Sequence, residues 1–207
     1  MARTHSTPVL LVLSAPSGAG KTTIARHLLA AQPGLSRVVT CTTRAPREGE
    51  VSGVDYHFLS EPEFLSRVAA NEFLEHAAVY GHHYGTLTAM VREKLDAGHD
   101  ALLVNDVQGA AAVSRLAKQD TQLCAALASV FVVPENLEVL RQRLESRAQD
   151  SAEVIARRLA EARAEMAQWE HFDYIVRSGT MEEDWRRVQA IYEAEKLRRT
   201  RVPPLVF

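Results

Sequence analysis

A run of small residues that ends in a lysine and a threonine has the clearest chemistry in the sequence. Residues 15–22 read Ala-Pro-Ser-Gly-Ala-Gly-Lys-Thr and follow an unbroken apolar run at Val9–Leu13. Glycine lets closely spaced backbone N–H groups approach a phosphate chain, and the start of a helix adds partial positive charge. Lys21 would reach the terminal phosphates, and the Thr22 hydroxyl would join the coordination shell of Mg²⁺. The segment therefore predicts a site for a nucleoside triphosphate.

The segment departs at one position from the P-loop pattern G-x-x-x-x-G-K-[S/T], because Ala15 stands where the pattern has its first glycine. The rest of the pattern is present, in the expected place between a strand and a helix. We expect the triphosphate to be bound by Ala15, Pro16, Ser17, Gly18, Ala19, Gly20, Lys21, Thr22 and Thr23.

The elements that must position this site alternate between strand and helix. Ala101–Val104 and Ser129–Val133 are apolar runs typical of buried parallel strands, and Tyr174–Val176 is a shorter one. Trp169 and Trp185 lie at helical spacing and are expected in the core. The alternation predicts an α/β fold, a parallel sheet flanked by helices. Apolar spacing predicts helices over residues 22–31, 108–118, 151–169 and 181–197.

Two segments interrupt the alternation. Residues 36–86 mix strand-like alternation with prolines and glycines, and they predict a small antiparallel β insertion with a helix near Glu61–Ala70. Residues 141–158 are rich in arginine and predict a mobile segment. The chain, residues 1–207, is then one domain, and its tail from Arg198 is expected to fray. The core would consist of residues 8–35, 87–140 and 159–198.

Composition narrows the class of protein. The chain has 207 residues, a net charge of −2 and 46% hydrophobic residues, as a globular domain does. Near-neutral charge predicts binding neither to nucleic acid nor to a membrane. Cys41 and Cys124 match no zinc or redox spacing, and Val9–Leu13 is too short for a signal sequence, so we expect a cytoplasmic protein. The oligomeric state stays open.

Five short motifs follow the phosphate loop in order, namely Thr42–Glu50, Asp55–Tyr56, Phe73–Ala77, Tyr84–Thr86 and Asp106–Gly109. Together with Ser14–Lys21 they resemble the signature of the guanylate kinase family over residues 9–176. The resemblance implies a P-loop nucleoside monophosphate kinase that transfers a phosphoryl group from ATP to GMP, and also to dGMP, in purine nucleotide metabolism. Mg²⁺ would be the cofactor.

The resemblance also implies an acceptor site. A monophosphate needs cations and hydroxyls, which arginine and tyrosine side chains supply. Guanine presents donors at N1 and N2, so one carboxylate can accept from both, and by resemblance Glu75 is that carboxylate. The implied GMP-binding residues are Thr40, Arg44, Arg47, Tyr56, Glu75, Tyr84, Thr86 and Asp106.

In guanylate kinases a lid places arginines over the ATP phosphates, and residues 141–158 correspond to it. Such arginines neutralise charge on the transferred phosphoryl group, and closure excludes water. Arg141, Arg157 and Arg163 are expected on the exposed helix surface instead. The implied catalytic residues are Lys21, Arg44, Arg143, Arg147 and Arg158.

The sequence departs from the family at two positions. Val104 stands where the family usually has an acid that assists Mg²⁺, and Ser178 stands where it commonly has an asparagine near adenine. Two alternatives therefore stay open. One is a kinase of the ribose 1,5-bisphosphate type, and the other is a non-catalytic guanylate-kinase-like binding module.

Overall fold

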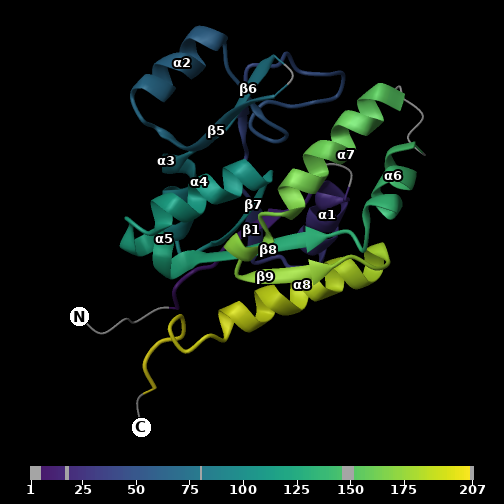
Figure 1. Ribbon diagram of the computed structural model, residues 1–207. Helices are drawn as coiled ribbons and strands as arrows, with labels where there is room; N and C mark the ends of the chain where they lie inside the picture. The colour runs from purple at the N-terminus through teal and green to yellow at the C-terminus, as the bar shows by residue number, and fades with distance from the viewer. Residues whose placement is uncertain (1–5, 17–18, 80, 146–151, 206–207) are drawn as a thin grey trace.

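A parallel sheet of five strands forms the centre of the computed structural model, which describes residues 6–16, 19–79, 81–145 and 152–205 (Figure 1). Every pair of neighbouring strands runs parallel, in the order β2-β7-β1-β8-β9. The apolar run predicted as the first strand is buried along its whole length, because the strand lies at the middle of the sheet. The strands are β1 (Leu10–Ser14), β2 (Leu35–Arg37), β7 (Asp100–Asn105), β8 (Leu127–Val133) and β9 (Tyr174–Arg177).

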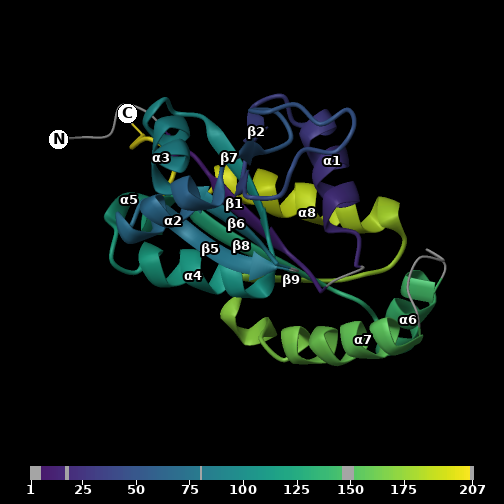
Figure 2. The same ribbon diagram turned by 90° about the horizontal axis from the view of Figure 1, so that it is seen from above.

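Helices cover both faces of this sheet (Figure 2). On one face α1 (Lys21–Ala31) and α8 (Met181–Lys196) pack Ile24, Leu28 and Val188 against the strands. The other face is covered by three helices, namely α3 (Thr88–Asp96), α4 (Val107–Ala117) and α5 (Thr121–Ala126). The prediction of a parallel sheet flanked by helices is confirmed.

A second, smaller sheet sits above the central sheet (Figure 1). Its order is β4-β3-β6-β5; β3 and β5 pair antiparallel with β6, whereas β3 and β4 run parallel. The insertion is thus mostly, but not wholly, antiparallel. Phe64 stacks on Phe73 at a centroid distance of 4.4 Å and gives the insertion its own small core. The elements are β3 (Cys41–Thr42), β4 (His57–Phe58), α2 (Glu61–Ala69), β5 (Phe73–Val79) and β6 (His82–Leu87).

The described parts of the arginine-rich segment belong to two helices that pack side by side, α6 (Leu137–Glu145) and α7 (Ala152–Met166) (Figures 1 and 2). Buried Leu140 and Ala162 hold them together. A short 3₁₀ turn, Trp169–His171, then leads into β9. No helix in the described ranges is long and apolar enough to cross a membrane.

Several local expectations were wrong. Trp185 packs against the core, but Trp169 is 50% exposed, because the helix ends at Met166 and the chain turns outward. The tail does not fray at Arg201, which is 2% exposed. Its guanidinium donates to both Glu195 and the carbonyl oxygen of Leu127.

Three elements that the structure contains, β2, α3 and α5, were not predicted from the sequence pattern.

Candidate active site

The phosphate loop joins the end of β1 to the start of α1. Gly20 has φ of 94°, a left-handed backbone, and a side chain there would lie 2.8 Å from the Cε atom of Met181. Lys21 Nζ donates a hydrogen bond to the carbonyl oxygen of Ala15, so the side chain folds back across the loop. Thr22 is exposed and Thr23 half-buried in the first helical turn, while Ser17 and Gly18 lie outside the described residues.

Two carboxylates face Lys21. Burial lowers the pKa of Lys21, and the charges of Glu165 and Asp106 act in the opposite direction. All three residues line one hollow of about 910 Å³, between the insertion, α4 and α7. This hollow therefore reaches from Lys21 to Asp106, one of the residues expected to recognise the base.

The residues expected to hold the acceptor phosphate gather around Arg44. Its guanidinium lies 5.5 Å from the centre of the Tyr56 ring, and the Tyr56 and Tyr84 rings are 6.1 Å apart. Arg44 Nη2 donates to both carboxylate oxygens of Glu50, at 2.8 and 2.9 Å. That contact and the backbone N–H of Arg47 lower the pKa of Glu50. Glu50 thus occupies the donors that a phosphate would use.

The residues expected to recognise the base meet where β5 and β6 face the start of α4. Thr86 Oγ1 donates to Glu75 Oε1 at 2.7 Å. Asp106 caps α4 by accepting from the backbone N–H of Gly109 at 2.7 Å. Burial raises the pKa of Glu75; the Thr86 hydroxyl opposes this, and the Asp106 charge adds to it. A Cβ atom on Gly109 would lie 3.1 Å from Glu75 Oε2, so only glycine lets the helix approach this closely.

Two expected GMP-binding residues, Thr40 and Arg47, make contacts through their backbone rather than their side chains. Thr40 is half-buried, and its carbonyl oxygen accepts from the backbone N–H of His57. Arg47 is exposed, and its backbone rather than its guanidinium contacts Glu50. The structure therefore brings Arg44, Tyr56 and Tyr84 into one group and Glu75, Thr86 and Asp106 into a second.

The structure describes only part of the predicted set of lid arginines. Arg158 is half-buried on α7. Arg143 belongs to α6, but its side chain lies outside what the structure describes, as does all of Arg147. Arg141 pairs with Glu138 and Arg157 with Glu161, both largely exposed, and Arg163 is exposed, as expected for helix-surface residues.

Three polar residues near the site were missed from the sequence. Glu165 is one of several acids on a surface helix, so nothing marked it. Arg37 lies 6.0 Å from the Tyr56 ring but belongs to a strand too short to recognise. Asn105 directly follows the Val104 departure, and a polar residue that ends a buried strand is a usable signal.

The donor set around the loop is compatible with Mg²⁺. This cation takes oxygen ligands, keeps several waters and is often held through substrate phosphates. The Thr22 hydroxyl is accessible, and one Asp106 oxygen is engaged by the helix cap. Val104 offers no oxygen from its side chain. The described residues contain no cluster of three or more His, Cys, Asp or Glu side chains that could hold a metal alone. A cation here would thus depend on phosphates and water.

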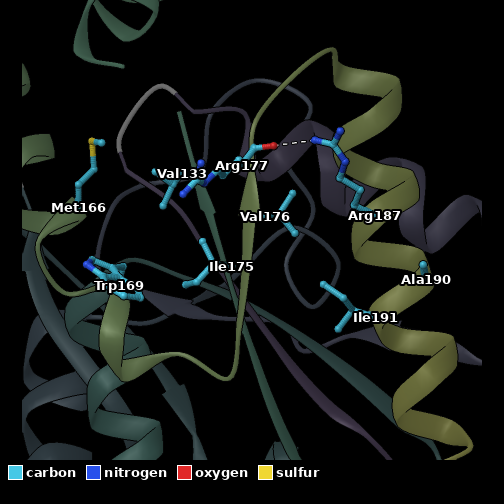
Figure 3. A pocket seen from close by; sticks show the side chains of 9 residues that line it. All are labelled: Val133, Met166, Trp169, Ile175, Val176, Arg177, Arg187, Ala190 and Ile191. Atoms are coloured by element: carbon cyan, nitrogen blue, oxygen red, sulfur yellow. Dashed lines mark hydrogen bonds between the residues drawn. The ribbon is translucent and has the colours of Figure 1, made fainter. Parts of the chain in front are cut away.

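A second hollow, of about 860 Å³, lies apart from the phosphate loop against β9 and α8 (Figure 3). Its wall includes Trp169 and Ile175, and at its rim Arg187 donates to the Arg177 carbonyl oxygen at 2.7 Å. Just beyond, the Ser178 hydroxyl donates to Asp184 at 2.6 Å. The side chain at the second family departure is therefore bonded within the protein.

Comparisons with known proteins agree with this geometry. A family model described as Guanylate kinase matches residues 7–195. The chain is 47% identical over 193 residues to a guanylate kinase of Paramagnetospirillum magneticum, covering 93% of this chain and 87% of that protein. It is 42% identical over 197 residues to one of Ruegeria pomeroyi, covering 95% and 90%. The crystal structure of guanylate kinase from Anaplasma phagocytophilum is similar, with a TM-score of 0.73, 32% identity and coverage of 95% and 90%. The chain belongs to the guanylate kinase family.

Proposed function

We propose that this chain transfers the γ-phosphoryl group of ATP to GMP, giving ADP and GDP. The observation that carries the proposal is the half-buried Glu75 carboxylate, which Thr86 holds at 2.7 Å beside Asp106. Asp106 also lines the hollow that contains Lys21, so base recognition and the phosphate loop share one cleft. The insertion binds GMP, and the loop with α6 and α7 binds ATP.

Glu75 selects guanine by hydrogen-bond polarity. Its two oxygens accept from the N1–H and N2–H groups of guanine. Adenine has an acceptor at N1, which would leave the carboxylate unpaired and repelled in a buried site. Thr86 orients the carboxylate, and Asp106 lies near enough to accept a further bond from the N2 amino group. Thr40 would add a further contact to the base.

Arg44 binds the acceptor phosphate together with Arg47, Tyr56 and Tyr84. In the structure Arg44 Nη2 donates to Glu50, and Nη1 donates to the carbonyl oxygen of Ala45. The phosphate of GMP carries acceptor oxygens of the same kind, and a forked guanidinium can bind two of them at once. Glu50 therefore keeps Arg44 in place until GMP arrives.

The transfer itself needs no general base, because the GMP phosphate is already ionised at neutral pH. One of its oxygens attacks the γ-phosphorus, and the bond to the β-bridging oxygen breaks, leaving its electron pair on ADP. Lys21 and the lid residues Arg143, Arg147 and Arg158 stabilise the charge on the transferred group. Mg²⁺, held through Thr22, phosphates and water, would neutralise further phosphate charge.

An ADP-release assay with ATP and one acceptor at a time tests the proposal. The acceptors are GMP, dGMP, AMP, UMP, CMP and the sugar phosphate ribose 1,5-bisphosphate. We expect turnover with GMP and dGMP. Turnover with only the sugar phosphate would replace the proposed activity by the related sugar-phosphate kinase reaction. No turnover with any acceptor, with GMP binding retained, would indicate a binding module. We expect the reaction to occur in the cytoplasm, in purine nucleotide metabolism.

A further inference from the structure

Asn105, the last residue of β7, is a buried amide that the proposed mechanism does not use. It is 7% exposed, and its Nδ2 atom has no hydrogen-bond partner within the described part of the chain. An unpaired buried donor is destabilising, and such groups are rare in folded proteins. An acceptor beside this donor would therefore be stabilised by it.

The Glu75 carboxylate lies beside this amide. A Cβ atom built on Gly109 would lie 2.8 Å from Asn105 Nδ2 and 3.1 Å from Glu75 Oε2. The amide and the carboxylate oxygen thus border the same small space beside α4. Thr86 already donates to the other oxygen, Oε1. Oε2 is therefore the oxygen that faces Asn105.

We propose that Asn105 is a positioning residue for Glu75, whose Nδ2 donates to Oε2 and so holds the carboxylate for GMP, an inference that rests on the proposed function. Each carboxylate oxygen has two lone pairs. Thr86 takes one on Oε1 and Asn105 takes one on Oε2. The remaining two then point toward the N1–H and N2–H groups of guanine. The two donors fix the plane of the carboxylate, and with it the plane of the base.

The charges around Glu75 give this contact a measurable consequence. Burial raises the pKa of Glu75, as does the charge of Asp106 at the start of α4. The Thr86 and Asn105 side chains act in the opposite direction, because both stabilise the carboxylate. Cys41 of β3 also faces Glu75, but burial raises the pKa of its thiol to about 11, so it stays neutral. Removing the Asn105 donor should therefore make Glu75 harder to ionise.

The test compares three variants of the full chain. Asn105→Leu removes the donor at similar volume, and Asn105→Asp replaces it by a charged acceptor. Asn71→Asp, at an exposed turn, is the matched control for the added charge. The readouts are the titration of Glu75 by carboxyl ¹³C NMR without nucleotide, and the KM for GMP and for ATP.

We expect Glu75 to titrate at higher pH in both Asn105 variants than in the wild type, and the KM for GMP to rise about tenfold, with the KM for ATP unchanged. Asn71→Asp should match the wild type. An unchanged Glu75 titration and GMP KM in a folded Asn105 variant would overturn the proposal. A wild-type chain inactive on GMP would overturn the proposed function instead. The NMR titration needs no nucleotide, so it would still decide whether Asn105 stabilises Glu75.

Discussion

The phosphate loop and the 36–86 insertion present their ligand groups in different ways. The shape of the loop is set by its backbone: Gly20 is left-handed, and Lys21 is bonded to the carbonyl oxygen of Ala15. In the insertion the side chains are bonded to one another, Arg44 to Glu50 and Thr86 to Glu75. A backbone cradle binds phosphate whatever the nucleotide, whereas paired side chains recognise one base. The donor side thus contributes rate, and the acceptor side contributes specificity.

Lys21→Met should give the largest effect, and it acts on rate. Losing this cation removes charge stabilisation in the transition state, so we expect kcat to fall about 10³-fold. The affinity for GMP, measured by calorimetry, should stay within about twofold because the insertion is untouched. Lys118→Met, at an exposed lysine, is the matched control. A kcat within tenfold of the wild type would mean that the loop contributes little to the rate.

Glu75→Gln should give the largest effect on specificity. The amide offers one acceptor instead of two and leaves a guanine donor unpaired, so the KM for GMP should rise about 100-fold with the KM for ATP unchanged. Glu72→Gln, at an exposed acid, is the control.

The same variant has a predicted pH signature. Only the ionised carboxylate accepts both guanine donors, and burial raises the pKa of Glu75. In the wild type kcat/KM for GMP should therefore fall as the pH falls through that raised pKa, above the ordinary range for glutamate. Glu75→Gln should lack this acid limb. An identical limb in both proteins would assign it to another group.

Gly109→Ala tests the close approach of α4 to the base pocket. The added methyl group would meet Asn105 Nδ2 at 2.8 Å and Glu75 Oε2 at 3.1 Å. We expect the KM for GMP to rise about tenfold, with little change in kcat at saturating GMP. Gly34→Ala adds a methyl group where no atom lies within 4 Å, and should behave as the wild type. Equal KM values in the two variants would show that the pocket adapts to the methyl group.

Val104→Asp should give the smallest effect, on the donor side. It restores an acid where the family usually has one, at a half-buried position near the end of β7. We expect the half-saturating Mg²⁺ concentration to fall about threefold, since carboxylate oxygens suit this cation. Val104→Asn is the control, because asparagine has the shape of aspartate without its charge. If both variants need as much Mg²⁺ as the wild type, Asp106 and the phosphates suffice.

The fold was predictable where the sequence pattern is local. Val9–Leu13 is an unbroken apolar run, and it becomes the central strand because only a strand covered on both faces has that composition. Leu35–Arg37 is equally part of the central sheet, but three residues at its edge, two of them polar, carry no such signal. Arg201 reads as part of a charged tail, yet besides Glu195 it bonds carbonyl oxygens that lie more than 70 residues away in sequence.

The candidate site shows the same division. The phosphate loop was assigned from one short segment, because its chemistry is in the backbone spacing. The base pocket needed the family resemblance, since Glu75, Thr86 and Asp106 come from three elements that only the fold brings together. Glu50 and Asn105 emerged only from the structure. Their roles depend on which donor or acceptor lies next to them, and spacing along the chain does not encode that.

The most direct test of the account is the ratio of kcat/KM for GMP to that for AMP, measured in the wild type and in Glu75→Gln. If the Glu75 carboxylate selects the base, the wild type should strongly prefer GMP and the variant should lose most of that preference. An equally strong preference for GMP in Glu75→Gln would contradict the account and place base selection in other residues.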